Sequence, residues 1–448
     1  MNIAIVGAGW AGLAAASDSL ARGFSVTMFD AAHTAGGRAR AVYDPSLGEL
    51  DNGQHLMIGG YRQTLRLMQK DMGDAVVASN LLRLPLWLRS ADHTFELRAR
   101  SGNASALTKA WTTAWTSACA LARAKGLNLH DKWQIARFLQ RLGKNHDEPD
   151  AQATPSVAQW LTAEKQTKNA CRWLWYPLCL ATLNTAPEQA CAKLFSKVIK
   201  DSLLSKDPGA TDLLIPRTTL SELWPRAVAA RVNMRWGHTV RQILADHNRV
   251  YVDGQPFDAC VVATPPASTR RLLSPLPELA SVCAQLNQFD YRAIATCYVG
   301  LDRHDPLPAP LMLFDHAESD NTKLAQWVFD RTQIMHTAPA AQLAFIVSDA
   351  GNLPEQSDTE LAQSMVHQLG KAQGKKDIPS VIGARCFVEK RATFAALPGL
   401  NRPHNETPIR GLVLAGDWTD TGYPAVIEGA VQSGLAAIAA LTKQNHPA

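Results

Sequence analysis

The chain has 448 residues, of which 46% are hydrophobic and 19% are charged. This composition excludes an intrinsically disordered chain, and the length predicts two domains rather than one. The net charge of +5 is small, and no basic stripe indicates binding to nucleic acid. The eight cysteines are scattered without a C-x-x-C pair, so we expect reduced thiols, with neither a disulfide framework nor a metal site.

The N-terminal residues predict a binding site for a dinucleotide. A short apolar strand at 2–6 leads into the turn G-A-G-W-A-G, and a helix continues to residue 22. Gly7 makes the tight turn, Gly9 leaves the backbone open to a pyrophosphate, and Gly12 lets the helix pack closely on the strand. The free N–H groups at the start of the helix then face the anion.

Two features after this turn specify the cofactor. A second strand at 25–29 ends in Asp30, whose carboxylate can accept from a ribose hydroxyl and repels a 2′-phosphate. The run of Gly36, Gly37 and Arg38 follows, and this extension resembles the motif of FAD-dependent amine oxidases, phytoene desaturases and their relatives. The resemblance implies FAD as the cofactor.

The C-terminal residues carry the second half of this resemblance. An apolar strand at 411–415 precedes Gly416 and Asp417, and a helix begins at Ile427. The resemblance implies that Asp417 and nearby backbone amides hold the pyrophosphate and the ribityl chain. It also implies that the helix N-terminus faces the flavin, where its positive dipole end stabilises the negative charge of the reduced form.

A third segment of the cofactor domain is expected in the middle of the chain. We expect a strand at 212–216, a helix at 220–231 and strands at 232–236, 239–245, 250–252 and 257–263. The last strand ends in A-T-P-P and resembles the one that returns to the nucleotide-binding sheet in this superfamily. The same resemblance places the backbone of Val240 against the adenine, with an ordinary sheet valine as the equal alternative.

The predicted fold is therefore α/β, with a discontinuous Rossmann-type FAD-binding domain and a mixed helical and β-sheet substrate domain like that of amine oxidases. We expect the FAD-binding domain to comprise residues 1–80, 211–270 and 406–448, and the substrate domain residues 81–210 and 271–405. In the first, helical insert, Trp111 and Trp115 share one helix face, which favours a core role over a ligand site. In the second insert we expect strands at 291–301, 324–330, 343–347 and 381–388 and a helix at 359–371.

Several segments resemble one family closely, the hydroxysqualene dehydroxylases, also described as squalene-associated FAD-dependent desaturases. They are D-N-G-Q-H at 51–55, the stretch 175–185 with its L-N-T sequence, Q-W-V-F-D-R at 326–331, and G-D-W-T at 416–419 with the I-E-G-A sequence that follows. Val426 departs from amine oxidases, which carry an aromatic cage residue there, and an aliphatic side chain offers no face to an amine cation. Asp30 stands where the family usually has the longer Glu.

The resemblance implies reductive loss of the hydroxyl group of hydroxysqualene, a C30 isoprenoid alcohol, to give squalene for hopanoid synthesis. Breaking an allylic C–O bond and quenching the cation with a hydride requires an acid, a reduced flavin and a long dry tunnel. Asp51 and His55 are the candidate acids, because histidine titrates near neutrality and their loop follows the flavin motif closely. In the alternative interpretation, Asp51, Asn52 and Gln54 only cap this loop beside the flavin ring. Asp330 and Arg331 could equally form a structural ion pair.

Two other functions stay open. An oxidative desaturase of a carotenoid-type polyprenyl substrate would share the fold but reverse the electron flow, so reduced protein would form no product without oxygen. A flavin-containing protein that only delivers prenyl lipid to a partner would bind the lipid without any change in the redox state of its flavin.

The sequence also bears on location and partners. No secretory signal is recognisable, and no run of about 20 apolar residues could cross a bilayer. We therefore expect a cytoplasmic protein whose tunnel entrance makes peripheral contact with the inner face of the cell membrane, through apolar and cationic residues of an insert. The Trp-rich insert is a candidate docking surface for a prenyl synthase of the same pathway.

Overall fold

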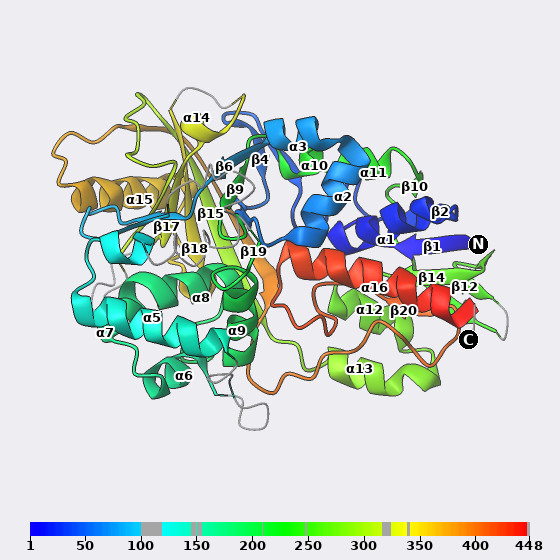
Figure 1. Cartoon of the computed structure of the whole chain (residues 1–448). Coiled ribbons are helices and arrows are strands. Elements are labelled where there is room, and N and C mark those ends of the chain that lie inside the picture. Colours follow the sequence, from blue (N-terminus) through cyan, green and yellow to red (C-terminus); the bar gives the residue numbers. More distant parts are fainter. Residues whose placement is uncertain are drawn as a thin grey trace.

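The computed structural model describes residues 1–99, 119–144, 149, 155–207, 209–246, 249–315, 324–337 and 341–445. The two termini lie in the same part of the molecule, beside the sheet that contains the first strand (Figure 1). The predicted helix face with Trp111 and Trp115 lies outside the described residues.

A parallel sheet with the strand order β10-β2-β1-β14-β20 forms one half of the fold. Its central strands are short apolar runs that are buried on both faces, as expected for parallel strands covered by helices. Because the strands come from the two ends and the middle of the chain, the predicted discontinuous α/β fold is confirmed. The strands are β1 (Asn2–Val6), β2 (Ser25–Phe29), β10 (Asn233–Arg235), β14 (Ala259–Val262) and β20 (Leu412–Leu414).

Two helices pack on each other beside this sheet, α1 (Trp10–Ala21) and α16 (Ile427–Asn445) (Figure 1). Their contact is close because Gly434 has no side chain, and a Cβ atom there would lie 2.2 Å from the carbonyl oxygen of Ala11. The C-terminal helix α16 therefore packs directly against the helix of the glycine turn.

An antiparallel sheet with the strand order β16-β17-β18-β15-β19 forms the core of the second half, with helix α15 (Asp358–Gln373) packed on β15 and β19. The strand predicted at 381–388 continues to Phe394. Its charged end, which includes Lys390 and Arg391, is tolerated because β19 is an edge strand. The strands are β15 (Tyr291–Leu301), β16 (Leu311–Leu313), β17 (Trp327–Asp330), β18 (Gln342–Ser348) and β19 (Val381–Phe394).

The first insert is mostly helical from residue 129 onward (Figure 1). The expectation that it is helical from residue 81 is wrong. Residues 81–98 hold three short strands, each with one buried residue among more exposed ones. The strands are β6 (Leu81–Leu84), β7 (Trp87–Arg89) and β8 (Glu96–Arg98). The helical segments that follow are α5 (Leu129–Gly143), α6 (Val157–Ala163), α7 (Lys168–Ala170), a π-helical turn (Cys171–Trp175), α8 (Tyr176–Leu183) and α9 (Ala192–Asp201).

Two predicted elements of the central segment are shorter than expected. The helix predicted at 220–231 is divided into α10 (Leu220–Leu223) and α11 (Pro225–Ala229), because Pro225 has no N–H group to continue the first helix. The strand predicted at 239–245 is reduced to β11 (Ile243–Ala245), so Val240 lies outside any strand. The remaining elements are β3 (Ala41–Asp44), β4 (Gly48–Asp51), β5 (Met57–Ile58), α2 (Arg62–Met72), α3 (Asp74–Asn80), β9 (Leu213–Pro216), β12 (Val250–Val252), β13 (Gln255–Phe257), α12 (Pro266–Leu273), α13 (Ala280–Leu286), α14 (Arg331–Ile334) and 3₁₀ turns at Pro277–Leu279 and Ala350–Asn352.

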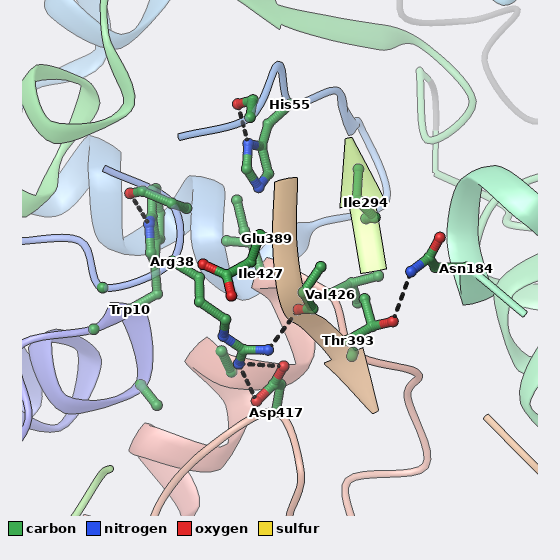
Figure 2. A pocket seen from close by; sticks show the side chains of 18 of the residues that line it. Trp10, Arg38, His55, Asn184, Ile294, Glu389, Thr393, Asp417, Val426 and Ile427 are labelled. Carbon is green, nitrogen blue, oxygen red and sulfur yellow. Dashed lines mark hydrogen bonds and ion pairs between the residues drawn. The ribbon is translucent and has the colours of Figure 1, made fainter. Parts of the chain in front are cut away.

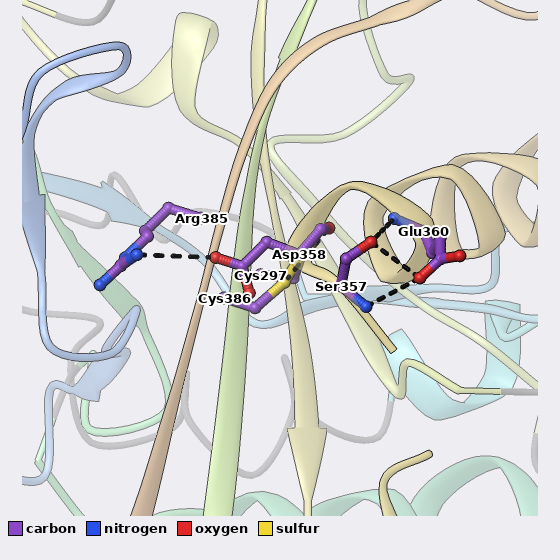
Figure 3. The surroundings of a disulfide bond; sticks show 6 residues. All are labelled: Cys297, Ser357, Asp358, Glu360, Arg385 and Cys386. Atoms are coloured by element: carbon purple, nitrogen blue, oxygen red, sulfur yellow. Dashed lines mark hydrogen bonds and ion pairs between the residues drawn. A yellow bond between two sulfur atoms is a disulfide. The ribbon is translucent and has the colours of Figure 1, made fainter. Parts of the chain in front are cut away.

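The expectation that all eight cysteines are reduced thiols is wrong for two of them. Cys297 and Cys386 form a disulfide between β15 and β19, with their Cα atoms 4.0 Å apart (Figure 3). The two residues lie directly opposite each other in the register of the antiparallel pair. Their separation of 89 residues gives no local pattern, which is why the sequence does not reveal the pair.

Candidate active site

A cavity of about 650 Å³ lies where the two halves of the fold meet. Its lining combines the glycine turn, the first residues of α1 and α16, and side chains from β15 and β19 (Figure 2). Every predicted cofactor residue except Gly12 lines this cavity, and of the two predicted acids only His55 does.

The glycine turn leaves room for a phosphate group where the sequence predicts one. A Cβ atom on Gly7 would lie 2.6 Å from the carbonyl oxygen of Ala263, and one on Gly12 would lie 2.0 Å from the carbonyl oxygen of Gly7. A Cβ atom on Gly9 would instead point into space, with Gly37 Cα at 4.0 Å as its nearest neighbour. Gly7 and Gly12 therefore allow close backbone packing, and Gly9 keeps the N-terminus of α1 open to an anion.

Arg38 and Asp417 form an ion pair across the cavity wall. The Arg38 guanidinium donates to both carboxylate oxygens of Asp417, at 2.7 and 2.6 Å, and to the carbonyl oxygen of Ala392 at 2.6 Å (Figure 2). Burial lowers the pKa of Arg38, but the paired carboxylate outweighs it and the net shift is upward. The sequence predicted both residues as cofactor ligands but not their contact, which fixes the G-G-R loop against the C-terminal segment.

The other predicted cofactor residues lie around the same cavity. Asp30 accepts hydrogen bonds from the backbone N–H groups of Ala8 at 2.6 Å and Ala32 at 2.7 Å. Val240 is buried, and its carbonyl oxygen accepts from Arg271 Nη2 at 3.0 Å. Ile427 is the first residue of α16 and lies close to Val426 at the centre of Figure 2.

Asp51 lies at the end of β4, behind the cavity wall. Its Oδ1 atom accepts from the backbone N–H of Leu220 at 2.8 Å, at the start of α10. Burial raises the pKa of Asp51 to about 7, opposed by this hydrogen bond and by the nearby charge of Arg331. The carboxyl group is therefore only partly protonated near neutrality, and it is not among the groups that line the cavity.

His55 faces the cavity as a neutral ring. Its Nδ1 atom lies 2.7 Å from the carbonyl oxygen of Gly53, and a carbonyl oxygen can only accept, so the proton is on Nδ1. The other ring nitrogen points into the pocket (Figure 2). Burial lowers the pKa of His55, and the charge of Arg38 adds to this effect. The cavity-facing nitrogen is therefore a hydrogen-bond acceptor at neutral pH.

Asp330 and Arg331 do not form the structural ion pair of the alternative interpretation. The Asp330 carboxylate lies 3.1 Å from His304 Nε2 and accepts from the N–H of Leu307 at 3.0 Å. The buried Arg331 guanidinium donates to Gln342 Oε1 at 2.7 Å and to Gln54 Oε1 at 2.9 Å. Arg331 thereby ties the D-N-G-Q-H loop to β18.

Sequence reasoning missed Glu389, whose side chain lines the cavity near the start of α16 (Figure 2). Its Oε2 atom accepts from Asn52 Nδ2 at 3.3 Å, so it contacts the D-N-G-Q-H loop. The signal in the sequence is a charged residue directly after the apolar run at 381–388, where the pattern alone predicts the end of a strand.

Asn184 of the L-N-T sequence holds the strands that carry this part of the site. It ends α8 in the left-handed conformation, with φ of 47°, and is buried. Its Nδ2 atom donates to Thr393 Oγ1 at 3.0 Å and to the carbonyl oxygen of Ala293 at 3.3 Å, and its Oδ1 accepts from the N–H of Asp349 at 2.7 Å (Figure 2). One side chain therefore links α8 to β15 and β19.

Glu428 of the I-E-G-A sequence has a structural contact of its own. Its carboxylate is buried and accepts from the backbone N–H groups of Gln63 and Thr64, each at 3.0 Å, and from Thr64 Oγ1 at 2.7 Å. These are N–H groups of the first turn of α2, which a carboxylate stabilises. Glu428 thus fixes α2 to the start of α16.

The rest of the cavity wall combines a large apolar surface with scattered polar side chains such as Thr182, Asp201 and Thr296. Three tryptophans of the first insert, at 160, 173 and 175, are buried in the core and do not line the cavity. This agrees with the core role that the sequence favours for the tryptophans of this insert. Among the described residues, no group of three or more His, Cys, Asp or Glu side chains could hold a metal ion. The apolar lining includes Leu56, Ile58, Leu86, Leu178, Phe195, Ile199, Leu213, Ile294, Trp327, Phe329 and Ile346.

Comparison with known proteins places this site in a family. The family model described as flavin containing amine oxidoreductase matches residues 10–441. A hydroxysqualene dehydroxylase of Rhodopseudomonas palustris is 28% identical over 97% of this chain and 96% of its own length. A zeta-carotene desaturase of Arabidopsis thaliana is 22% identical over 97% of this chain and 84% of its own length.

The fold has a counterpart among solved structures. Cyclohexylamine oxidase from Brevibacterium oxydans superposes with a TM-score of 0.67 at 16% identity, over 99% of both chains. The chain therefore belongs to the flavin containing amine oxidoreductase family, in which it resembles the hydroxysqualene dehydroxylases along nearly its whole length, and it is an oxidoreductase that uses FAD.

Proposed function

We propose that this protein removes the hydroxyl group of hydroxysqualene, or a closely similar C30 allylic alcohol, to give the hydrocarbon squalene. The observation that carries the proposal is a cavity with two kinds of lining. The glycine turn and the start of α16 line one part of it, and large aliphatic and aromatic side chains line the rest. An apolar chain would lie along this wall, with the carbon that bears the hydroxyl group near the flavin.

The reaction replaces a C–O bond by a C–H bond and therefore consumes one proton and one hydride, with release of water. The hydride comes from FAD, once an external two-electron donor such as a reduced nicotinamide has reduced it. The apolar wall excludes the water that would recapture an allylic cation. Gly9, Asp30 and the Arg38–Asp417 pair are placed to hold the cofactor.

Val426 supports an uncharged substrate over an amine. It lines the cavity beside Ile427, where a cation would need an aromatic face (Figure 2). An aliphatic side chain packs instead against hydrocarbon, which agrees with an isoprenoid chain at this position.

Oxidative desaturation of a carotenoid-type polyprenyl substrate is the second candidate, favoured by the likeness to zeta-carotene desaturases. The two functions differ in the redox state that reacts. Anaerobic protein that has been photoreduced should convert hydroxysqualene to squalene and oxidise its flavin, whereas a desaturase would act only when oxidised. A delivery protein would leave the flavin unchanged in both states.

We also propose that the protein contacts anionic membranes through α5. The structure has no helix, among the described residues, that is long and apolar enough to span a bilayer. On α5, Leu129 and Trp133 are 86% and 55% exposed, one helical turn apart. The Arg137 guanidinium lies 5.3 Å from the centre of the Trp133 ring, and Arg141 follows on the same face. An exposed Trp beside arginines is suited to the interface of an anionic bilayer.

Binding to vesicles tests this surface. We expect co-sedimentation with phosphatidylglycerol vesicles at low salt and release at high salt, because the attraction to anionic lipid is screened. A Leu129→Ser and Trp133→Ser double variant should lose most of this binding. Tyr43→Ser, which changes a 72% exposed aromatic residue on β3, is the matched control. Equal binding by the double variant and the control would exclude α5 as the contact.

A further inference from the structure

Glu389 occupies an irregular position in β19. Ile294 of β15 pairs with Glu389, but the next paired residues are Arg292 and Thr393. A single residue of β15, Ala293, therefore faces three residues of β19, and the bulge redirects the strand at this point. Asn184 holds both sides of the bulge, through Ala293 and Thr393. The position of Glu389 is thus fixed by packing rather than left to a flexible loop.

The surroundings of Glu389 leave its carboxyl group facing the cavity. Oε2 accepts from Asn52 Nδ2 at 3.3 Å and Oε1 from the N–H of Arg391 at 3.2 Å, and neither donor carries a charge at the donating atom. Arg38, the nearby cation, donates to both oxygens of Asp417, and Glu389 makes no hydrogen bond to it but contributes with Asp417 to raising its pKa. Figure 2 shows the carboxyl group between the level of His55 and the start of α16.

Other acidic groups of the cavity are less suited to give up a proton. Asp417 is paired with Arg38, and Asp201 accepts from Lys197 Nζ at 2.9 Å, so each of these groups already has a cation as its partner. Asp30 lies at the glycine turn, where it binds the Ala8 N–H. His55 presents an unprotonated nitrogen to the cavity.

We propose that Glu389 is the acid that protonates the departing hydroxyl group, an inference that rests on the proposed function. The Glu389 carboxyl gives its proton to the hydroxyl oxygen, the C–O bond breaks, and both bonding electrons leave with the oxygen as water. FAD, when bound in its reduced form, would supply the hydride that this carbon takes up, and Glu389 regains a proton from solvent when the product leaves. The free nitrogen of His55 is placed to accept from the substrate hydroxyl and so to orient it.

The test compares Glu389→Gln with the wild type in a single turnover of anaerobic, photoreduced protein with hydroxysqualene. Glutamine keeps the size of the side chain and an oxygen for Asn52 but has no proton to give. We expect squalene formation to slow by on the order of 10²-fold or more, with unchanged flavin content. The control is Glu278→Gln, in the exposed 3₁₀ turn before α13, and it should react as the wild type does.

A second substrate separates proton donation from a structural role. The acetate ester of hydroxysqualene loses acetate, which needs no proton to depart, so Glu389→Gln should reduce it at nearly the wild-type rate. A Glu389→Gln protein that turns over the alcohol normally would overturn the proposal, as would one that is equally slow with the ester. A loss confined to Asp51→Asn or His55→Ala would also overturn it, whereas a wild type that forms no squalene would overturn the proposed function itself.

Discussion

Replacement of Gly9 by valine should give a colourless protein that folds but binds no FAD. Gly9 has an extended backbone, with φ of −76° and ψ of 175°, which valine adopts without strain. Its Cβ position points into the open space in front of α1, where the nearest atom, Gly37 Cα, lies 4.0 Å away. An isopropyl group there occupies the volume needed by a pyrophosphate at the helix N-terminus.

The measurement is flavin absorbance of purified protein, together with the amount of flavin released on denaturation. Gly351→Val is the matched control, since Gly351 also has free space around its Cβ position but lies outside the cavity lining. This control should remain fully loaded. A yellow, fully loaded Gly9→Val protein would mean that the glycine turn does not bind the cofactor.

Replacement of Gly434 by leucine should separate α1 from α16 and cost the protein at least about 3 kcal/mol of unfolding free energy. A Cβ atom at this position would lie 2.2 Å from the carbonyl oxygen of Ala11 and 2.9 Å from the Cβ atom of Ala14. The helices must move apart to admit it, and the first residues of both, which line the cavity, must move with them.

Urea unfolding measures the change, and the flavin content reports the displacement of the two helix N-termini. Gly351→Leu adds the same side chain at an open position and should alter the unfolding free energy by less than about 0.5 kcal/mol. An unfolding free energy of Gly434→Leu within that same margin of the wild type would contradict the close packing of the helices.

The parts of the fold that the sequence predicts well are those specified by local patterns. The strands β1 and β2 and the turn between β1 and α1 follow from apolar runs and glycine spacing over a few residues. The helix that begins at Ile427 follows in the same way. The break at Pro225 also has a local signal, since proline cannot continue a helix.

The features that escaped prediction depend on contacts between distant segments. The Cys297–Cys386 disulfide follows from the register of two strands, and the position of Glu389 follows from a bulge in the same pair. Asp51 shows the limit for site residues, because its loop lines the cavity but its own side chain accepts from the start of α10 and is not part of the lining. Motifs locate a loop, while packing decides which of its side chains reaches the substrate.

Transfer of deuterium from the reduced cofactor to the product tests the central claim most directly. Protein photoreduced anaerobically in D₂O carries deuterium at flavin N5, and it is then mixed with hydroxysqualene. The account predicts squalene with one deuterium on the carbon that held the hydroxyl group, formed at the rate at which the flavin is reoxidised, and no product from oxidised protein. Squalene without deuterium, or a flavin that stays reduced while squalene forms, would contradict it.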